Sequence, residues 1–282
     1  MPAPERMLTH LRHAIALVRA TPGRKGRIID LQDCTELLVA GDLHGQIGNF
    51  QVMLKAADLA NNSTRHFVLQ ELIHGKSRYP KGGDKSHQLV DLFAALKSQF
   101  PKQVHFIPGN HEMAQWTNRP VLKADENLNV LFQTGVTEAY GPEYGPQVYD
   151  TYLDLFRALP VVLRTPNRVL VCHSLPSARV LSFFDPTRLD ADLYNPDDLQ
   201  PGGVVHSILW GRDTSASTAQ EFLRRMNADL LISGHIACEQ GFQIPNPHQI
   251  ILDCAEYPGG YILFPTTQPL TQNELREHIR LI

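Results

Sequence analysis

Short apolar runs that end in glycine-containing strings constrain the fold of this chain more than any other feature. The string Gly41–Gly45 (Gly-Asp-Leu-His-Gly) follows the run Glu36–Ala40, and the string Gly109–Glu112 (Gly-Asn-His-Glu) follows Val104–Ile107. Each β-branched-rich run predicts a buried strand, and each string predicts a tight loop at the carboxyl end of that strand, where open α/β sheets place ligands. An Asp and a His two positions apart can reach one cation, and an Asn-His pair can reach a second. The two strings therefore predict metal chemistry at the edge of a sheet.

Helical and strand-like segments alternate along the chain, which predicts an α/β architecture with sheets covered by helices. Apolar spacing predicts helices at 5–20, 49–60, 86–100 and 122–159, the last interrupted at 139–146. Further strands are predicted at 26–30, which looks paired with 36–40, and at 66–69, 161–164, 169–172, 230–232, 250–253 and 260–264. Residues 71–84 and 176–203 are expected to form loops. We expect a single domain over residues 1–282, with residues 1–25 as an N-terminal helical extension.

The bulk composition excludes several classes of protein. The 282 residues are 43% hydrophobic and 20% charged with a net charge of −3, so nothing favours binding to nucleic acid or to an anionic membrane. No apolar run approaches the length of a membrane span, and the N-terminus lacks a signal-peptide core. The four cysteines form no Cys-x-x-Cys pair, which predicts buried free thiols in a reducing compartment. We therefore expect a cytoplasmic protein, and its oligomeric state stays open.

Side chains of the kinds that bind metal ions recur at the ends of successive predicted strands. These candidate ligands are Asp42, His44, Glu71, Asn110, His173 and His235. A single carboxylate or imidazole at a strand end is usually a cap or a surface residue, but several in order, with glycines beside three of them, are rarely accidental. Mixed oxygen and nitrogen ligands suit Mn, Fe or Zn better than Ca or Mg.

The ordered strings resemble the motifs of calcineurin-like metallophosphoesterases, and the chain looks like a divergent bacterial-type member of their phosphoprotein phosphatase (PPP) branch. That branch shows G-D-x-H-G and G-N-H-E, then a lone His after a strand, then G-H, which is residues 234–235 here. Residues 154–160 (DLFRALP) and 171–177 (VCHSLPS) resemble its D-L-F-x-x-L-P and H-G-G-L-S-P strings. The second His of the G-H-x-H string in other branches is absent. The resemblance spans about residues 36–265.

The resemblance implies a fold and a metal centre. The fold would be a sandwich of two mixed β-sheets flanked by helices, with a binuclear site at the carboxyl ends of the strands. Asp42 and His44 would bind the first metal ion. Asn110, His173 and His235 would bind the second, and a carboxylate would bridge both ions. Two divalent or trivalent transition-metal ions are implied, and we expect Mn, with Fe or Zn as alternatives.

The implied reaction is hydrolysis of a phosphomonoester by direct attack of a metal-bound water. His111 would protonate the leaving oxygen as a general acid. The substrate would be a phosphoprotein, on Ser, Thr or Tyr, or a small phosphoester. Two alternatives stay open. One is symmetrical diadenosine-tetraphosphate hydrolysis, and the other is a weakly active pseudo-phosphatase that binds phosphate.

The second motif of the branch, G-D-x-x-D-R-G, is strongly altered in this chain. A Gln-Glu pair replaces its Gly-Asp pair, so Glu71 is the predicted bridge. The family's next Asp orients the general-acid His, and no carboxylate replaces it here. An ungapped count puts His74 at that place, where it could equally be a surface loop residue, and another alignment puts Lys81 nearby. The motif's phosphate-binding Arg is also missing. Arg78, Lys76 or Lys81 could supply its charge, and the alternative for each is a place in a solvated basic loop.

Arg212 and Tyr257 are further candidates for substrate contacts. Residues 209–213 (LWGRD) resemble the W-x-R string of bacterial and phage members, whose Arg contacts the phosphate, as suits a planar guanidinium. The alternative for Arg212 is a surface pair with Asp213. Tyr257 stands where the family has an A-P-N-Y string at the cleft rim. The histidines at 10, 13, 66, 105 and 248 are interpreted as surface or packing residues, and those at 87 and 206 stay open.

Overall fold

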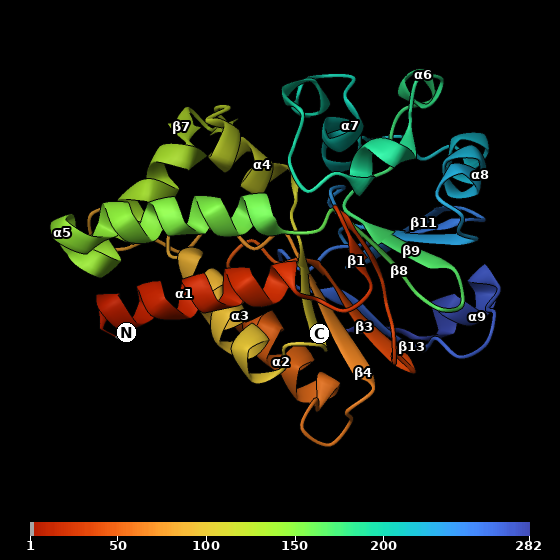
Figure 1. The fold of residues 1–282 in the computed structure, drawn as a ribbon, viewed down its shortest axis with the longest axis horizontal. Helices are drawn as coiled ribbons and strands as arrows, with labels where there is room; N and C mark the ends of the chain where they lie inside the picture. Colours follow the sequence, from red (N-terminus) through yellow and green to blue (C-terminus); the bar gives the residue numbers. More distant parts are fainter. Residues whose placement is uncertain (1–2) are drawn as a thin grey trace.

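A computed structural model describes residues 3–282, which form two large β-sheets with helices packed around them (Figure 1). The helices are α1 Pro4–Arg19, α2 Ile47–Ala57, α3 His87–Gln99, α4 Asn110–Thr117, α5 Leu128–Ala158, α6 Ala178–Leu181, η1 Pro186–Asp190, η2 Pro196–Leu199, α7 Val204–Trp210, α8 Ala216–Arg225 and α9 Gln272–Glu277. The strands are β1 Arg24–Lys25, β2 Ile28–Asp30, β3 Glu36–Asp42, β4 Arg65–Gln70, β5 Val104–Ile107, β6 Leu122–Lys123, β7 Glu126–Asn127, β8 Val162–Arg164, β9 Val169–Cys172, β10 Leu230–Ser233, β11 Phe242–Asn246, β12 Gln249–Leu252, β13 Gly260–Pro265 and β14 Ile279–Leu281.

Both large sheets are mixed, and each contains three consecutive parallel strands. The five-stranded sheet has the order β14-β13-β3-β4-β5, and the seven-stranded sheet has the order β1-β2-β8-β9-β10-β12-β11. Strands β3, β4 and β5 run parallel, as do β9, β10 and β12, and antiparallel neighbours flank them. Because parallel strands end on the same side, each sheet has one edge where carboxyl ends collect. The predicted α/β sandwich of two mixed sheets is confirmed.

Side-chain alternation along β3 explains how the sheets and helices form layers. Leu37 and Val39 join one buried cluster with Ile232 and Leu252 of the other sheet. Leu38 and Ala40 belong instead to the larger cluster that the helices cover. Since successive side chains of a strand point to opposite faces, β3 buries apolar groups on both of them.

Helices cover the outer faces of the two sheets. Helix α1 packs against α3 and α5, α3 packs on β5, and α8 packs on β10 and β11 (Figure 1). The predicted N-terminal helix is confirmed, and Leu11, Ala14 and Val18 bury its apolar face at helical spacing. Among residues 3–282, no helix combines the length and apolarity needed to span a membrane.

The structure corrects the predicted pairing of the strands at 26–30 and 36–40. Strand β2 pairs with β1 and β8 in one sheet, whereas β3 pairs with β13 and β4 in the other. Strand β3 is buried on both faces, and the strands that hydrogen-bond to its two edges come from other parts of the chain. Its sequence neighbour β2 therefore belongs to the opposite layer.

Several other boundaries differ from the predictions. The helix predicted from residue 122 begins at Leu128, after the β6–β7 hairpin, and its interruption lies at Gly141, whose φ is 79°. The predicted loop at 176–203 contains the short helices α6, η1 and η2. The Gly109–Glu112 string, predicted to form a tight loop, enters helix α4 at Asn110. Strands β11 and β14 and helices α7, α8 and α9 also lie where no element was predicted.

Candidate metal centre

The side chains that the sequence marks as metal ligands lie together at strand ends from both sheets. Asp42 ends β3, Glu71 follows β4, and Asn110 opens the helix after β5. His173 follows β9, and His235 lies two residues after β10. These are carboxyl ends of parallel strands in each sheet, so the site lies where the ligand-bearing edges of the two sheets meet.

Glu71 lies between the two halves of this site. Its Oε2 is 3.1 Å from His44 Nε2, and its Oε1 is 3.5 Å from His173 Nε2. His44, Glu71 and His111 form one group of side chains that could hold a metal ion, and Asp42, Glu71 and His173 form another. Because Glu71 directs one carboxylate oxygen toward a histidine of each group, it occupies the position that a bridging ligand needs.

Asn110 and His235 complete the cluster. Asn110 Oδ1 is 3.2 Å from His173 Nε2, and the ring centroids of His173 and His235 are 4.9 Å apart. The main-chain N–H of His235 donates to Asp42 Oδ2 at 2.6 Å. The structure thus brings together every ligand candidate from the sequence, although their roles as ligands stay predictions.

Three atoms of the cluster have no hydrogen-bond partner within residues 3–282. They are Asp42 Oδ1, His173 Nδ1 and His235 Nε2, and all three are buried. A buried polar atom without a partner costs about 1–3 kcal/mol of folding free energy. A carboxylate oxygen and imidazole nitrogens are ligands for Mn, Fe or Zn. The residues therefore fit the transition-metal ions that the sequence predicts.

Two glycines make room for the carboxylates. A Cβ added at Gly109 would lie 2.0 Å from Glu71 Oε1, and one added at Gly234 would lie 2.1 Å from Asp42 Oδ1. Both distances are far below van der Waals contact, so any side chain at these positions would displace a proposed ligand. The glycines of the G-N-H-E and G-H strings are thus explained by close approach rather than by backbone conformation.

Electrostatics in the cluster favour an anionic Glu71, neutral imidazoles at His173 and His235, and a protonated imidazole at His44. Against the effect of burial, the surrounding histidines hold the pKa of Glu71 well below its ordinary value. Burial lowers the pKa of His173 to about 4 and that of His235 to about 3. Against burial, Glu71 raises the pKa of His44 to about 10. Since metal binding displaces protons from its ligands, a cation beside Glu71 would take the place of the His44 proton.

Glu112 fixes the altered second-motif loop to helix α4. Its Oε1 accepts the main-chain N–H groups of Leu72 and Ile73 at 2.9 and 3.2 Å, and its Oε2 accepts that of Gly109 at 2.8 Å. Glu112 is fully buried, and burial together with the charge of Glu71 raises its pKa to about 7. The last residue of the G-N-H-E string therefore sets the path of the loop that follows β4.

His74 lies at the end of that path, directly beside His111. The Nδ1 atoms of the two rings are 2.7 Å apart, and His74 Nε2 is 2.8 Å from Gln115 Oε1. His74 is only 7% exposed, so it is not the surface loop residue that the sequence allowed. Lys81, the other candidate for this place, is exposed, and its main-chain N–H donates to Glu138. The ungapped count from Glu71 in the sequence was the signal that pointed to His74.

Arg212 lies beside the second half of the cluster. Its Nη1 donates to the main-chain oxygen of His235 at 3.3 Å. Asp213, its alternative partner, instead accepts the N–H groups of Ala178 and Ser215 at 3.1 and 2.9 Å. Within the described part of the chain, no carboxylate pairs with Arg212. Its guanidinium is therefore available for an anion, and the predicted phosphate contact stays a prediction.

Arg78 is held by acceptors of its own loop. Its Nη1 donates to the main-chain oxygen of Gly75 and lies 3.8 Å from Asp84 Oδ1, while its Nη2 lies 3.9 Å from Glu126 Oε2. These contacts favour a role in holding the loop. The phosphate contact predicted for Arg78 stays a prediction.

Tyr257 lies on a loop that meets the second-motif loop. The neighbouring Glu256 forms an ion pair with Lys76, and Asn49 Nδ2 donates to the main-chain oxygen of Cys254 at 2.9 Å. Tyr257 itself is 85% exposed. An exposed aromatic ring on an anchored loop suits the predicted rim contact, which stays a prediction.

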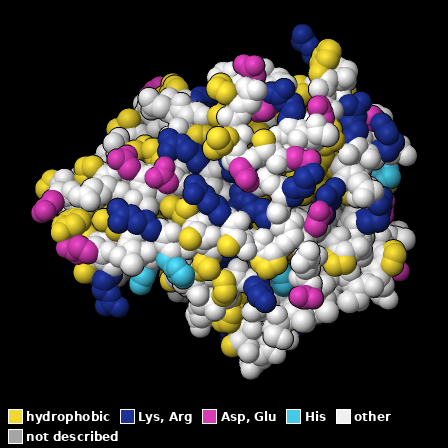
Figure 2. Space-filling view, in the orientation of Figure 1, with side chains coloured by type: hydrophobic (Ala, Val, Ile, Leu, Met, Phe, Trp, Pro, Cys, Tyr) yellow, Lys and Arg dark blue, Asp and Glu magenta, His cyan; other side chains and the backbone are white. Residues whose placement is uncertain are grey.

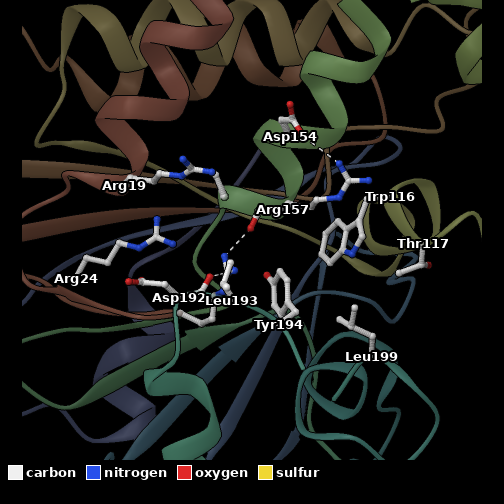
Figure 3. Close-up of a pocket in the computed structure, with 12 residues that line it drawn as sticks. Arg19, Arg24, Trp116, Thr117, Asp154, Arg157, Asp192, Leu193, Tyr194 and Leu199 are labelled. Carbon is white, nitrogen blue, oxygen red and sulfur yellow. Dashed lines mark hydrogen bonds and ion pairs between the residues drawn. The ribbon is translucent and has the colours of Figure 1, made fainter. Parts of the chain in front are cut away.

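A cavity of about 920 Å³ lies outside this cluster, against α1 and the carboxyl end of α5 (Figure 3). Its lining includes Arg24, Arg27 and Tyr194. Arg24 donates to the main-chain oxygen of Val18 at 2.9 Å, and Arg27 stacks on Tyr194 and donates to main-chain oxygens. Arg24 and Arg27 therefore join distant segments of the chain.

Figure 2 shows Lys and Arg side chains over the middle of this face with Asp and Glu between them.

Family and sequence comparisons point to one group of proteins. Residues 35–239 match the family model described as calcineurin-like phosphoesterase. A probable serine/threonine-protein phosphatase of Encephalitozoon cuniculi (strain GB-M1) is 25% identical over 262 residues, which cover 84% of this chain and 51% of that protein. The chain thus spans about half the length of this curated relative.

Solved structures share the fold. A protein serine/threonine phosphatase from Saccharomyces cerevisiae, with similarity to human phosphatase PP5, has a TM-score of 0.69 at 15% identity, covering 100% of this chain and 89% of that chain. A cold-active protein-tyrosine phosphatase of a psychrophilic Shewanella species has a TM-score of 0.56 at 14% identity, covering 84% and 76%. At these identities the likeness shows the fold alone.

Proposed function

Because the chain belongs to the calcineurin-like phosphoesterase family, whose model matches residues 35–239, we propose that it is a metal-dependent phosphomonoesterase. Its substrates would be phosphoproteins, on Ser, Thr or Tyr, or small phosphoesters. The observation that carries the proposal is the position of Glu71, which belongs to two groups of side chains able to hold a metal ion. The names of the relatives, which are serine/threonine and tyrosine phosphatases, support the substrate class.

The proposed metal centre uses the whole cluster. Its ligands would be Asp42 and His44 for the first ion, Asn110, His173 and His235 for the second, and Glu71 for both. We expect Mn, with Fe or Zn as alternatives, because the ligands mix oxygen and nitrogen atoms. When bound, two such ions supply Lewis-acid activation of the phosphoester and of an attacking water.

The remaining steps belong to side chains of this protein. Arg212 would bind the phosphate through its guanidinium, which contacts the cluster at His235 and pairs with no carboxylate in the described part of the chain. His111 would bind a proton from solvent at its Nε2 and pass it to the leaving oxygen, since its Nδ1 already contacts His74. Tyr257 would contact the substrate at the rim.

We also propose that the protein works in a reducing compartment, the cytoplasm. All four cysteines are free in the structure, and Cys34, Cys172 and Cys254 are buried. Burial raises the pKa of Cys172 and of Cys254 to about 12, so these thiols stay protonated and unreactive at neutral pH.

Metal content and turnover of the purified chain test the proposal together. Elemental analysis should find transition metal in the wild type, and para-nitrophenyl phosphate should be hydrolysed when Mn²⁺ is added. Asn110→Ala and His173→Ala should each lower metal content and reduce the rate at least about 100-fold, because each removes a proposed ligand. His13→Ala, on the exposed face of α1, is the matched control and should change neither quantity.

Other results would replace the proposal. Full-rate hydrolysis by Asn110→Ala or His173→Ala would contradict the metal mechanism. If only dinucleoside polyphosphates are turned over, the protein hydrolyses the polyphosphate linkage rather than a phosphomonoester bond. Bound metal without turnover of any monoester, phosphopeptide or dinucleoside polyphosphate would show a binding protein instead of an enzyme.

A further inference from the structure

The imidazoles of His74 and His111 belong to a chain of hydrogen bonds that continues through Gln115. We infer that His74 is a positioning residue for His111. It accepts the hydrogen on His111 Nδ1, so Nε2 is the nitrogen that binds a proton from solvent, which makes the ring an imidazolium, and then gives that proton to the leaving oxygen. The inference rests on the proposed function, in which His111 protonates the leaving oxygen.

The orientation of the Gln115 amide is fixed by its other partners. Its Nε2 donates to the main-chain oxygen of Asn129 at 3.2 Å and to the Tyr149 hydroxyl at 2.8 Å. A main-chain oxygen only accepts hydrogen bonds, so the NH₂ group must face Asn129. Turning the amide over would bring Oε1 against the main-chain oxygen of Asn129, and neither oxygen can donate. Gln115 Oε1 therefore faces His74.

This orientation determines where each hydrogen lies. Since Gln115 Oε1 only accepts, His74 Nε2 must carry a hydrogen. Burial lowers the pKa of His74 to about 4, and a neutral imidazole has only one N–H, so His74 Nδ1 is an acceptor. The facing atom at 2.7 Å, His111 Nδ1, is then the donor. No described residue hydrogen-bonds to His111 Nε2, which is left for the substrate.

The main chain holds His74 independently of its ring. The N–H of His74 donates to Ser86 Oγ at 3.0 Å, and the N–H of Gly75 donates to Asp84 Oδ2 at 3.1 Å. Glu112 anchors the two preceding residues. His74 has a φ of 64°, a left-handed conformation that is rare for a non-glycine residue and persists only where its surroundings enforce it. Since His and Asn are better tolerated than Leu at this φ, the test of the hydrogen bond compares reactions that differ in their need for a proton, and not the rate of a single reaction.

An imidazole does part of what a carboxylate would do at this place. Both accept the Nδ1 hydrogen of His111 and so select the same tautomer. A neutral imidazole adds no negative charge, which a carboxylate would. The chain thus keeps the orientation of His111 by a different acceptor, and the loss of the family's Asp does not leave His111 unsupported.

The same two strands offer a matched control. His66 in β4 and His105 in β5 form a second buried imidazole contact, with His66 Nδ1 3.0 Å from His105 Nε2. Both residues lie near the amino ends of their strands, whereas the proposed ligands lie at the carboxyl ends. His105→Leu removes a buried contact between imidazoles without touching the candidate site.

The experiment compares two leaving groups in the full-length, Mn-loaded protein. Para-nitrophenolate leaves with little need for a proton, whereas phenolate needs one. His74→Leu should lower kcat on phenyl phosphate about 100-fold and kcat on para-nitrophenyl phosphate far less, with KM and metal content unchanged. His74→Asn should restore most of the loss, because its Oδ1 stands close to the place of Nδ1. His105→Leu should leave the ratio of the two rates as in the wild type.

Two outcomes overturn the inference. One is an equal loss on both substrates in His74→Leu, which indicates a general structural role, and the other is no loss on either. A wild type inactive on every phosphoester overturns the proposed function instead, and the tautomer then tests His74 by itself. In ¹⁵N NMR of the protein loaded with Zn²⁺, which is diamagnetic, the His111 signals, identified by their loss in His111→Gln, should show the Nδ1–H tautomer in the wild type. That preference should vanish in His74→Leu, and an unchanged tautomer there would overturn the inference.

Discussion

Strands β4 and β5 carry a histidine near their amino ends and another just beyond their carboxyl ends, and both ends bring two imidazoles into contact. At the amino ends, His66 and His105 stack with ring centroids 5.2 Å apart. At the carboxyl ends, His74 and His111 meet edge to face at 4.8 Å. Each contact joins two imidazoles, one in or after β4 and the other in or after β5, so their surroundings decide what each pair can do.

The surroundings differ in where each hydrogen-bond chain leads. His105 Nδ1 is buried without a partner among the described residues, and the nearby Lys97 donates to the main-chain oxygen of Val104. This chain ends inside the protein. The His74 ring continues to Gln115 on one side and to His111 on the other. The loops that follow the carboxyl ends of parallel strands can carry a hydrogen-bond chain that ends at a ligand. The pair at the amino ends has only a packing role.

The largest effect is expected from crowding the carboxyl-end site. In Gly109→Ala the new Cβ would lie 2.0 Å from Glu71 Oε1, so the proposed bridge must move. We expect loss of bound metal and about a 10³-fold lower rate. Gly48→Ala is the control, since a Cβ at Gly48 meets nothing within 4 Å. Normal metal content in Gly109→Ala would contradict the proposal that the carboxyl ends of β4 and β5, unlike their amino ends, carry a metal site.

Acid should destabilise the amino-end pair. Burial, with a contribution from Lys97, lowers the pKa of His66 from 6.5 to about 4. The unfolded chain therefore binds more protons between these values, and the free energy of unfolding falls as the pH is lowered through that range, by up to about 3 kcal/mol for this group. Urea unfolding at a series of pH values measures it. In His66→Gln the slope against pH should be smaller, and an unchanged slope would contradict the assignment.

Breaking the amino-end contact should affect stability alone. His105→Leu leaves His66 Nδ1 buried without its partner, which costs about 1–3 kcal/mol of folding free energy. Chemical denaturation measures the loss, and kcat per folded molecule should equal that of the wild type. A selective drop in turnover of phenyl phosphate would show that the His66–His105 contact also affects the reaction. The proposed difference between the two histidine pairs would then be wrong.

The smallest effect is expected one step farther from the reaction. Gln115→Leu removes the acceptor that fixes the His74 ring, so both tautomers of His74 become available. We expect about a tenfold lower kcat on phenyl phosphate, less than for His74→Leu, with KM unchanged. Loss as large as that of His74→Leu would mean that tautomer selection rests on Gln115 and not on the contact between the rings.

The proposed ligands could be predicted because each belongs to a local pattern. An apolar run, a glycine and a ligand-type side chain follow one another within a few residues, as at Asp42 and at Asn110. The carboxyl end of a parallel strand is a defined place in an α/β sheet, so candidates on different strands could be expected to meet. Even Glu71, with its altered motif, could be expected from its place after β4.

Other features depend on contacts between distant segments. The partners of β2 and β3 are decided by which strands complete each sheet, and those strands are far away in the sequence. The role of Asp213 as a cap rather than as a partner of Arg212 depends on where Ala178 lies. The local sequence around these residues does not specify their partners, because it is equally compatible with several pairings.

The sequence by itself thus determined the strands that precede the proposed ligands, the residue types at the ends of those strands, and the family. The tertiary structure alone decided what supports His111. Residue 74 could be a surface loop residue or a site residue until Glu112 and Ser86 were seen to hold its main chain. The physical reason is that a loop of this composition has no preferred path of its own. Its course follows from buried hydrogen bonds to residues that lie 12 and about 40 positions away in the chain.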